Sequence, residues 1–281
     1  MNHLTLAILM ATYNGERYVG EQLDSILSQT FSQWHLFLHD DGSTDGTLAI
    51  LKSYADRYPQ QITLLDYPPQ GGAFRNFMSM LEKVESDYYM FSDQDDIWHS
   101  DKIEKTMDAM SKAEQKGEQH PVVVHTDLRV VDENGKATVS SFWQQAGMHP
   151  DMFHTFAQRI TNVVTGCTML FNKPARNAAL GKKPNGNPLH DEWVTIRSCA
   201  EGGRVVPIFD QLIDYRQHTD NTLGAEACYH RKTWTYYLTS LRKIYHENRD
   251  NYRVLQSAGY GSPIVYIFNK LRNMMVYHLK Y

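Results

Sequence analysis

The feature that most constrains the fold is an alternation, in the first half of the chain, of short apolar runs with helix-length amphipathic segments. The apolar runs read LTLAILMATY, WHLFLHDD, ITLLDY and DYYMFSD. Strand-length apolar runs that alternate with helices are typical of βαβ units, in which helices cover both faces of a parallel sheet. The sequence therefore predicts an α/β protein, with helices expected over residues 15–29, 45–58, 72–84 and 99–116.

Polar clusters follow three of these expected strands. ATYNGE follows the first strand, HDDGSTDG the second and SDQDD the fourth. Sheets of this kind bind ligands beyond the carboxyl ends of their strands. The last cluster brings Asp93, Asp95 and Asp96 together, and such like charges destabilise a fold unless a cation lies among them. The sequence therefore predicts a cation site at this edge of the sheet.

The pattern changes after the fourth expected helix. PVVVHTDLRVVDENGK is typical of a hairpin that turns at Asn134-Gly135. A strand is expected over Thr165–Phe171, a helix over His190–Glu201 and an extended segment in RVVPIFDQLIDYRQH. Because no internal repeat or low-complexity linker divides the chain, we expect one domain over residues 1–222 and a helical tail over residues 223–281.

Composition excludes several classes of protein. With 42% hydrophobic and 21% charged residues, the chain of 281 residues is typical of a globular protein rather than a disordered or fibrous one. No apolar stretch reaches the roughly 18 residues that a membrane-spanning helix needs, and the run Leu4 to Met10 is predicted to be a strand rather than a signal peptide. Three cysteines without a CxxC spacing predict neither disulfides nor a zinc site, so a reducing, cytoplasmic setting is expected.

The charge of the chain is uneven. The net charge is −4, yet from residue 229 onward the only acidic residues are Glu247 and Asp250 among many basic and aromatic ones. Basic residues interleaved with aromatics suit an anionic membrane surface or a phosphorylated partner. A helical tail that packs on its own acidic body would have the same composition. Both interpretations of the tail stay open, and nothing in the pattern points to a nucleic acid.

Six segments occur in a characteristic order: ATYNGERYVGEQLDSILSQT, DDGSTDGT, FSDQDDIW, TGCTMLFN, LHDEW and YRQH. Together they resemble family-2 glycosyltransferases of the GT-A fold, and the last two are most similar to bacterial rhamnosyltransferases that build surface polysaccharide. The resemblance implies a Rossmann-like, mixed but mainly parallel sheet with helices on both faces, followed by the helical tail. It also implies that the chain transfers a sugar from a nucleotide diphosphate to an acceptor hydroxyl.

The resemblance implies a nucleotide-sugar site made by the turns after the strands. Tyr13 offers an aromatic face, and Asn14 tolerates the backbone of a sharp turn. A plain strand-to-helix turn would read the same way. Asp45 is interpreted as a cap or first-turn acid of the following helix. The residues matched to the nucleotide-sugar site are Thr12, Tyr13, Asn14, Glu16, Asp40, Asp41, Arg75, Asn76, Asp93 and Gln94.

The resemblance also implies a metal. Asp93-Gln94-Asp95 matches the DxD signature of the family, whose carboxylates bind a divalent cation, here Mg2+ or Mn2+. Asp95 is expected to contact the metal directly, while Asp93 contacts the metal or the ribose. His218, in YRQH, matches a third ligand of the metal or pyrophosphate, and Asp96 is interpreted as a helix cap.

Asp191 matches the family's catalytic base, which deprotonates the acceptor hydroxyl in a single inverting displacement. Where the family usually has Glu-Asp, this chain has His190-Asp191, and Glu192 follows. Which of the two acids points inward stays open, and both could instead stabilise a helix N-terminus. Gly166, Glu192 and Trp193 are expected on the acceptor side, Trp193 as a wall for a sugar or as core, and Cys167 as a small buried residue.

The expected donor is dTDP-rhamnose, and the expected acceptor is a glycan or lipid-linked glycan, with peripheral contact to the cytoplasmic face of a membrane if the tail binds there. The alternatives are a UDP-hexose-dependent glucosyl or galactosyl transferase and a non-catalytic nucleotide-sugar or metal-binding module. An EF-hand over DGSTDG is excluded because Lys52 stands where a bidentate Glu is required. The absence of a GxGxxG fingerprint disfavours a nicotinamide enzyme.

Overall fold

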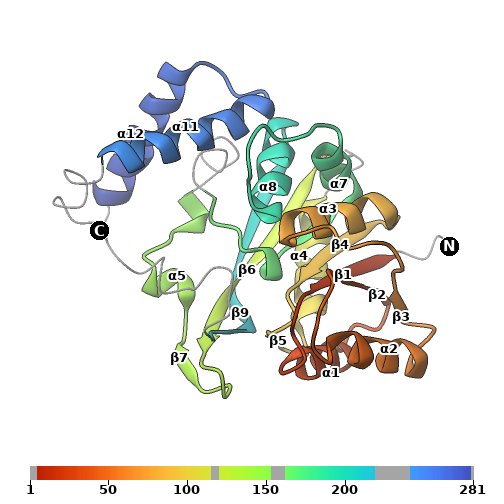
Figure 1. Ribbon diagram of the computed structural model, residues 1–281. Helices are drawn as coiled ribbons and strands as arrows, with labels where there is room; N and C mark the ends of the chain where they lie inside the picture. Colours follow the sequence, from red (N-terminus) through yellow and green to blue (C-terminus); the bar gives the residue numbers. More distant parts are fainter. Residues whose placement is uncertain (1–4, 115–119, 153–161, 219–240, 280–281) are drawn as a thin grey trace.

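A nine-stranded sheet with helices on both faces organises the part of the chain that the computed structural model describes, residues 5–114, 120–152, 162–218 and 241–279 (Figure 1). The strand order is β3-β2-β1-β4-β8-β6-β9-β5, with β7 paired to β6. The strands are β1 (Leu6–Thr12), β2 (Trp34–Asp40), β3 (Ile62–Leu64), β4 (Tyr88–Ser92), β5 (Ile97–Trp98), β6 (Val122–Val131), β7 (Ala137–Val139), β8 (Leu170–Asn172) and β9 (Arg204–Arg216). The helices are α1 (Val19–Leu27), α2 (Thr47–Arg57), α3 (Ala73–Lys83), α4 (Lys102–Ala113), α5 (Phe142–Gln145), α7 (Lys173–Leu180), α8 (His190–Ala200), α11 (Leu241–Ser257) and α12 (Pro263–Leu279), with 3-10 turns η1 (Pro150–Met152) and η2 (Gly166–Thr168).

The first four strands of the chain form the parallel part of the sheet, as predicted. β1 pairs in parallel with β2 on one side and with β4 on the other. Along β1, Leu6, Ile8 and Met10 pack into one hydrophobic cluster, while Ala7 and Leu9 pack into the cluster on the opposite face. This period of two explains the unbroken apolar run, because both faces of the strand are buried.

The order in which successive strands are added to the sheet reverses between β1 and β4. The chain moves outward from β1 to β2 and β3, then returns to add β4 on the other side of β1. In open α/β sheets a crevice forms outside the carboxyl ends of the strands at this switch point. The polar residues after Thr12 and Ser92 therefore lie at the place where the topology opens a site.

The second half of the sheet is mixed. β8 is antiparallel to both β4 and β6, whereas β9 is parallel to β6. The predicted hairpin is present, since β6 pairs with β7 around Gly135, which has a φ of 80°. The predicted strand over Thr165–Phe171 is wrong in its first part: Gly166–Thr168 forms a 3-10 turn, and β8 covers only Leu170–Asn172.

The strand β5 has only two residues, but it connects two parts of the site. Ile97 and Trp98 pair antiparallel with Asp214 and Ile213 of β9. This pairing joins the acidic loop that follows β4 to the end of β9, which lies far away in sequence. The sequence prediction contained no strand here, because two residues carry no periodicity.

The described part of the tail packs on the rest of the protein. Val254 and Leu255 of α11 and Tyr266 of α12 share a hydrophobic cluster with Trp193 of α8. The predicted boundary at residue 222 and the stretch 223–240 lie outside the described residues. Among the described helices none is both long and apolar enough to cross a membrane.

Candidate active site

The turn after β1 is bound to the loop after β2. The hydroxyl of buried Thr12 donates a 3.0 Å hydrogen bond to Asp40 Oδ1, and the Asp41 N–H donates to the Thr12 carbonyl. Asn14 has a φ of 49°, the left-handed conformation expected of it, and its Oδ1 accepts from the Thr44 N–H at 2.8 Å. Two of the predicted segments are therefore hydrogen-bonded to each other at the carboxyl ends of β1 and β2.

Glu16 and Asp45 serve the N-terminus of α2. The Glu16 carboxylate accepts from the N–H of Gly46, and Asp45 Oδ1 accepts from the N–H of Thr47 at 3.0 Å. Carboxylates satisfy the free N–H groups at a helix start. The N-cap of α2 is Gly46, so Asp45 is neither the cap nor a first-turn acid, but its carboxylate accepts from the first helical N–H, and Glu16 has a comparable contact.

Asp40 and Asp41 order the loops that carry the predicted nucleotide site. Asp40 accepts from the N–H of Ser43 at 2.8 Å. Asp41 accepts from the N–H groups of Gly71 at 3.0 Å and Gly72 at 2.7 Å, just before α3. These glycines have φ values of 76° and 122°, which other residues rarely adopt. The GGAFRNF segment is thus fixed against the second strand.

Within that segment, Arg75 and Asn76 have different surroundings. Arg75 is exposed, with its Nη1 near Gly71, whereas Asn76 is buried. The side chain of Asn76 forms a 2.6 Å hydrogen bond with Nδ1 of His39, whose ring stacks on Tyr67 with the centroids 3.6 Å apart. His39 was not among the predicted site residues. The sequence HDD does not show that the side chain of His39 is buried.

Gln94 positions Tyr13. Its Oε1 accepts from the Tyr13 N–H at 2.8 Å and its Nε2 donates to the Tyr13 carbonyl at 3.0 Å. The amide lies over Gly15, where an added Cβ would be 2.3 Å from Gln94 Oε1. The Tyr13 side chain is 58% exposed, so its ring is available as a stacking face. The middle residue of the DxD segment thus links the acidic loop to the turn after β1.

Asp93 lies close enough to Asp95 and Asp191 to be affected by both charges. Burial, with the negative charges of Asp95 and Asp191, raises the pKa of Asp93 to about 7. The structure therefore brings together the DxD acids and the predicted base, which are far apart in sequence. Three acids in such proximity favour a cation among them.

Asp96 does not cap a helix, contrary to the sequence interpretation. It precedes β5, its Oδ1 accepts from the N–H of Arg216 at 3.3 Å, and α4 begins only at Lys102. Burial raises the pKa of Asp96 well above its usual value. Asp96 is therefore a buried acid beneath the DxD loop.

His218 meets Asp95 at the end of β9. Nε2 of His218 lies 2.9 Å from Asp95 Oδ2, and its ring packs on Tyr18 with the centroids 4.8 Å apart. Arg216 supports the same loop, because its Nε donates to the Asp95 carbonyl at 3.0 Å and its Nη2 pairs with Glu21. The end of β9 therefore places His218, a candidate metal ligand, and Arg216, a structural cation, beside the acidic loop.

Two groups of side chains could hold a metal among the described residues. Asp95 and His218 are already in contact beside Asp93, and carboxylate and imidazole ligands suit Mn2+, with the carboxylates also suiting Mg2+. Ligand atoms of Asp93, Asp96 and Cys167 also lie within 4.8 Å of one another. Burial raises the pKa of the Cys167 thiol well above its usual value, and a protonated thiol is a poor ligand for a hard cation. The chemistry of the first group suits a hard cation better, whereas among the described residues only the second group brings three ligand atoms within 4.8 Å of one another.

Lys102 is a buried cation that the sequence did not reveal. Its Nζ donates to the Cys167 carbonyl at 2.9 Å and lies 4.5 Å from the centre of the Trp98 ring. Burial lowers the pKa of Lys102 to about 8. Cys167 is buried, as predicted, and Lys102 supplies positive charge beneath the acids of the loop.

Asp191 is placed at the start of α8 and is only 6% exposed. Burial raises its pKa to about 7. Glu192 turns back toward its own helix start, where its Oε2 accepts weakly from the Leu189 N–H at 3.4 Å. The charge of Asp191, and not that of Glu192, contributes to the raised pKa of Asp93, which favours Asp191 as the acid nearer to the DxD loop.

Gly166 allows η2 to pass close to the start of α8. A Cβ added to Gly166 would lie 2.6 Å from His190 Nε2 and 3.5 Å from Asp191 Cβ. The His190 ring is stacked on Phe77 at 4.1 Å, and burial lowers its pKa to about 3, so it is neutral. His190 and Gly166 thus hold Asp191 in place.

Trp193 corrects one prediction. Its side chain is fully buried, and its Nε1 donates to the Ala179 carbonyl at 3.0 Å. A side chain without exposed surface cannot form a wall for a sugar. Trp193 is a core residue, which is the second of the two interpretations that the sequence left open.

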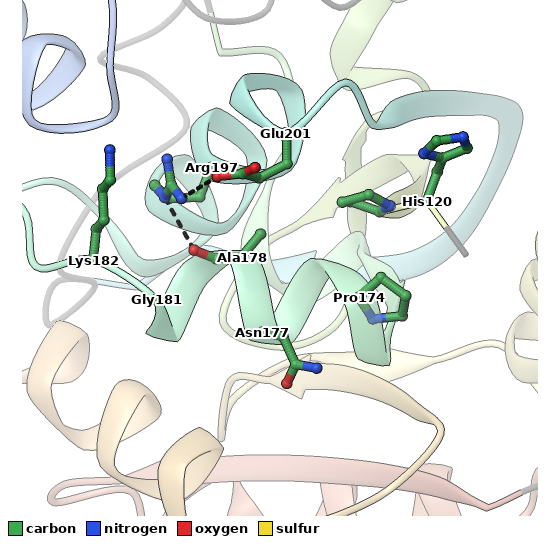
Figure 2. A pocket seen from close by; sticks show the side chains of 9 residues that line it. His120, Pro174, Asn177, Ala178, Gly181, Lys182, Arg197 and Glu201 are labelled. Atoms are coloured by element: carbon green, nitrogen blue, oxygen red, sulfur yellow. Dashed lines mark hydrogen bonds and ion pairs between the residues drawn. The ribbon is translucent and has the colours of Figure 1, made fainter. Parts of the chain in front are cut away.

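A shallow cavity of about 510 Å³ lies away from these residues, between α7 and α8 (Figure 2). Figure 2 shows Arg197 in this cavity, bound to Glu201 at 2.6 Å and to the Ala178 carbonyl at 3.0 Å. His120, which also lines it, precedes β6, a strand that runs parallel to β4, so the cavity is at the opposite edge of the sheet from the DxD loop. It contains none of the predicted site residues.

Known proteins resemble this chain in sequence. It is 44% identical over 105 residues to the dTDP-rhamnosyl transferase RfbG of Shigella flexneri, a match that covers 36% of each chain. It is 35% identical over 130 residues to the putative glycosyltransferase EpsE of Bacillus subtilis, which covers 46% of this chain and 45% of that protein. Both matches span less than half of the relative's length.

Solved structures resemble it in fold. TarS 1-349 of S. aureus in complex with UDP-GlcNAc matches with a TM-score of 0.58 at 18% identity, over 87% of this chain and 66% of that one. The mannosyltransferase PcManGT of Pyrobaculum calidifontis in complex with GDP-Man and Mn2+ matches with a TM-score of 0.59 at 15% identity, over 98% and 82%. These likenesses show the GT-A type of α/β fold.

A family model gives the assignment that the motifs and the fold both indicate. The model of glycosyl transferase family 2 matches residues 7–177, more than half of the chain. This range includes the loops after β1 and β2, the DxD loop and η2. The chain therefore belongs to glycosyl transferase family 2.

Proposed function

We propose that this glycosyltransferase moves L-rhamnose from dTDP-rhamnose to a glycan or a lipid-linked glycan, with inversion at the anomeric carbon. The observation that supports the proposal is that the charge of Asp191 acts on Asp93 of the DxD loop, while Asp95 of the same loop contacts His218. The rhamnosyl donor is supported by the likeness to RfbG and by the LHDEW and YRQH segments.

The proposed mechanism uses two parts of the site. Asp95 and His218, with Asp93, would hold Mg2+ or Mn2+, which supplies positive charge for the diphosphate. Tyr13, with the loop after β2, would hold the base and ribose. The remaining predicted donor residues, Thr12, Asn14, Glu16, Asp40, Asp41, Arg75, Asn76 and Gln94, would order or line this half of the site.

Asp191 would act on the acceptor. As the acceptor oxygen bonds to the anomeric carbon, the bond from that carbon to the diphosphate oxygen breaks, and its electron pair leaves with the nucleoside diphosphate. The acceptor proton passes to the Asp191 carboxylate. A carboxylate whose pKa is raised to about 7 by burial is a stronger base than an exposed one and is still about half ionised at pH 7. Gly166 and Glu192 border this side.

In this proposal the nature of the acceptor determines where in the cell the enzyme works. A lipid-linked acceptor implies work at the cytoplasmic face of a membrane, where nucleotide sugars are supplied, with contact through the tail. The alternative donor is a UDP-hexose, and the alternative function is a non-catalytic nucleotide-sugar or metal-binding module. TarS and PcManGT were solved with UDP-GlcNAc and GDP-Man, so the fold itself does not select the sugar.

A donor panel tests the proposal. The full chain is incubated with dTDP-rhamnose, UDP-glucose, UDP-galactose or UDP-GlcNAc, with Mn2+, Mg2+ or EDTA, and nucleotide diphosphate release is measured with and without a membrane lipid extract as acceptor. We expect metal-dependent release that is fastest from dTDP-rhamnose. Faster release from a UDP-hexose would replace the donor, and metal-dependent binding without release under any condition would favour the binding module.

A further inference from the structure

The polarity of α12 is inverted relative to that of an ordinary surface helix. Its inward residues Asn269 and Asn273 are buried polar side chains. Its outward residues are apolar: Ile264 is 78% exposed, Ile267 57%, Phe268 66% and Leu271 53%. These four residues, hereafter the α12 stripe, follow the i, i+3, i+4, i+7 spacing of a single helix face. An apolar stripe that faces outward marks an interaction surface.

Hydrogen bonds on the inner side fix this orientation. The Tyr266 hydroxyl bonds to Asn248 Oδ1 of α11 at 3.1 Å, and Asn269 Nδ2 donates to the Tyr260 hydroxyl at 3.1 Å. The rings of Tyr252 and Tyr266 also pack with centroids 5.6 Å apart, so α11 and α12 lie side by side (Figure 1). If α12 were rotated so that the α12 stripe faced inward, these contacts would break. The apolar side chains of the stripe would be buried, but the buried polar side chains of α12 would become exposed.

The charge around the α12 stripe favours one class of partner. No Asp or Glu occurs from Gly259 to Tyr281, whereas Arg272 and Lys270 lie on α12, with the Lys270 ammonium turned toward Asn248 of α11. An apolar helix face with cations and no acids suits the interface of an anionic bilayer. A second copy of the chain placed symmetrically on the same face would bring these positive charges together.

The inner face of α12, which lies opposite the α12 stripe, packs close to the start of α8. Burial, then Tyr260 and the negative charge of Glu192, raise the pKa of Tyr266 to about 12, which places the inner face of α12 near the start of α8. Tyr266 shares a hydrophobic cluster with Trp193, two residues after Asp191. Leu189, which directly precedes α8, is an apolar residue that is 43% exposed near the base.

We propose that the α12 stripe docks on an anionic lipid surface, so that the start of α8, with Asp191, is held beside a lipid-linked acceptor. The docking itself follows from α12 alone. Only the presence of the acceptor in that surface rests on the proposed function.

Vesicle flotation of the full chain tests the docking. We expect it to float with phosphatidylcholine–phosphatidylglycerol vesicles at low salt, and to float less with phosphatidylcholine alone or at high salt. Because Ile267 and Phe268 are exposed, the double substitution Ile267→Ser/Phe268→Ser should leave the fold intact and lower the vesicle-bound fraction about tenfold. The matched control is Phe209→Ser on β9, an exposed aromatic that lies off α12 and should have no effect.

Three results would overturn the proposal. The first is a wild-type chain that fails to float with anionic vesicles, and the second is a double variant that floats as well as the wild type. The third is a wild type that is a dimer and a double variant that is a monomer in sedimentation velocity without vesicles, because a second copy would then cover the stripe. Release of nucleotide diphosphate without vesicles separates this test from the proposed function, since the double variant should retain the wild-type rate.

Discussion

The substitution Asp191→Asn is expected to lower kcat by about two to four orders of magnitude, the usual contribution of a positioned general base. Asparagine keeps the size of the side chain but cannot accept the acceptor proton. Because Asp191 lies on the acceptor side and Asp95 and His218 are proposed to hold the metal, donor affinity should change little. Turnover is measured as nucleotide diphosphate release, and donor binding by calorimetry.

Glu192→Gln is the matched control for Asp191→Asn. Glu192 lies next in the chain but turns toward the Leu189 N–H, so its replacement should lower kcat far less. If Glu192→Gln abolished turnover while Asp191→Asn did not, the assignment of the base would be reversed.

The pH profile of the wild type provides a second measurement on Asp191. Burial raises its pKa to about 7, and only the ionised form is a base. The rate should therefore fall as the pH drops through about 7, by about tenfold per unit below it. A profile that stays flat down to pH 5 would contradict the role given to this carboxyl.

The substitution Asp95→Asn is expected to weaken dTDP binding in Mn2+ by about a hundredfold or more, because several kcal/mol of charge stabilisation depend on the metal. His218→Ala should act in the same direction, since Nε2 lies 2.9 Å from the Asp95 carboxylate. In EDTA, wild type and variants should bind dTDP alike. Titration calorimetry with and without Mn2+ measures both conditions.

Cys167→Ser distinguishes the two candidate metal groups. It alters the group of Asp93, Asp96 and Cys167 but leaves Asp95 and His218 untouched. We expect this variant to keep the response to Mn2+. Loss of the response in Cys167→Ser, with retention in Asp95→Asn, would move the metal to the buried group.

The parallel half of the fold could be predicted because it depends on the pattern of residues within each segment. A strand buried on both faces must be apolar throughout, as Leu6 to Met10 are, and the residues that follow it must be polar turn formers. The same reasoning placed the acids at the carboxyl ends of the strands, where β1 and β4 open the crevice.

Contacts between distant segments could not be predicted in this way. The approach of His218 to Asp95 depends on the pairing of β5 with β9, and β5 has only two residues. The burial of Lys102 and Trp193 depends on packing between elements, which residue type alone does not determine. His218 and Asp191 were identified by their resemblance to family segments, and only the fold brings both of them to the DxD loop.

The configuration of the product tests the central claim most directly. If Asp191 deprotonates the acceptor for one direct displacement, the anomeric configuration of the transferred sugar must invert. The glycoside formed from dTDP-rhamnose and an alkyl glycoside or lipid acceptor is isolated, and its anomeric configuration is determined by NMR. Inversion is the predicted result. Retention of the donor configuration would require a second displacement and would contradict the account.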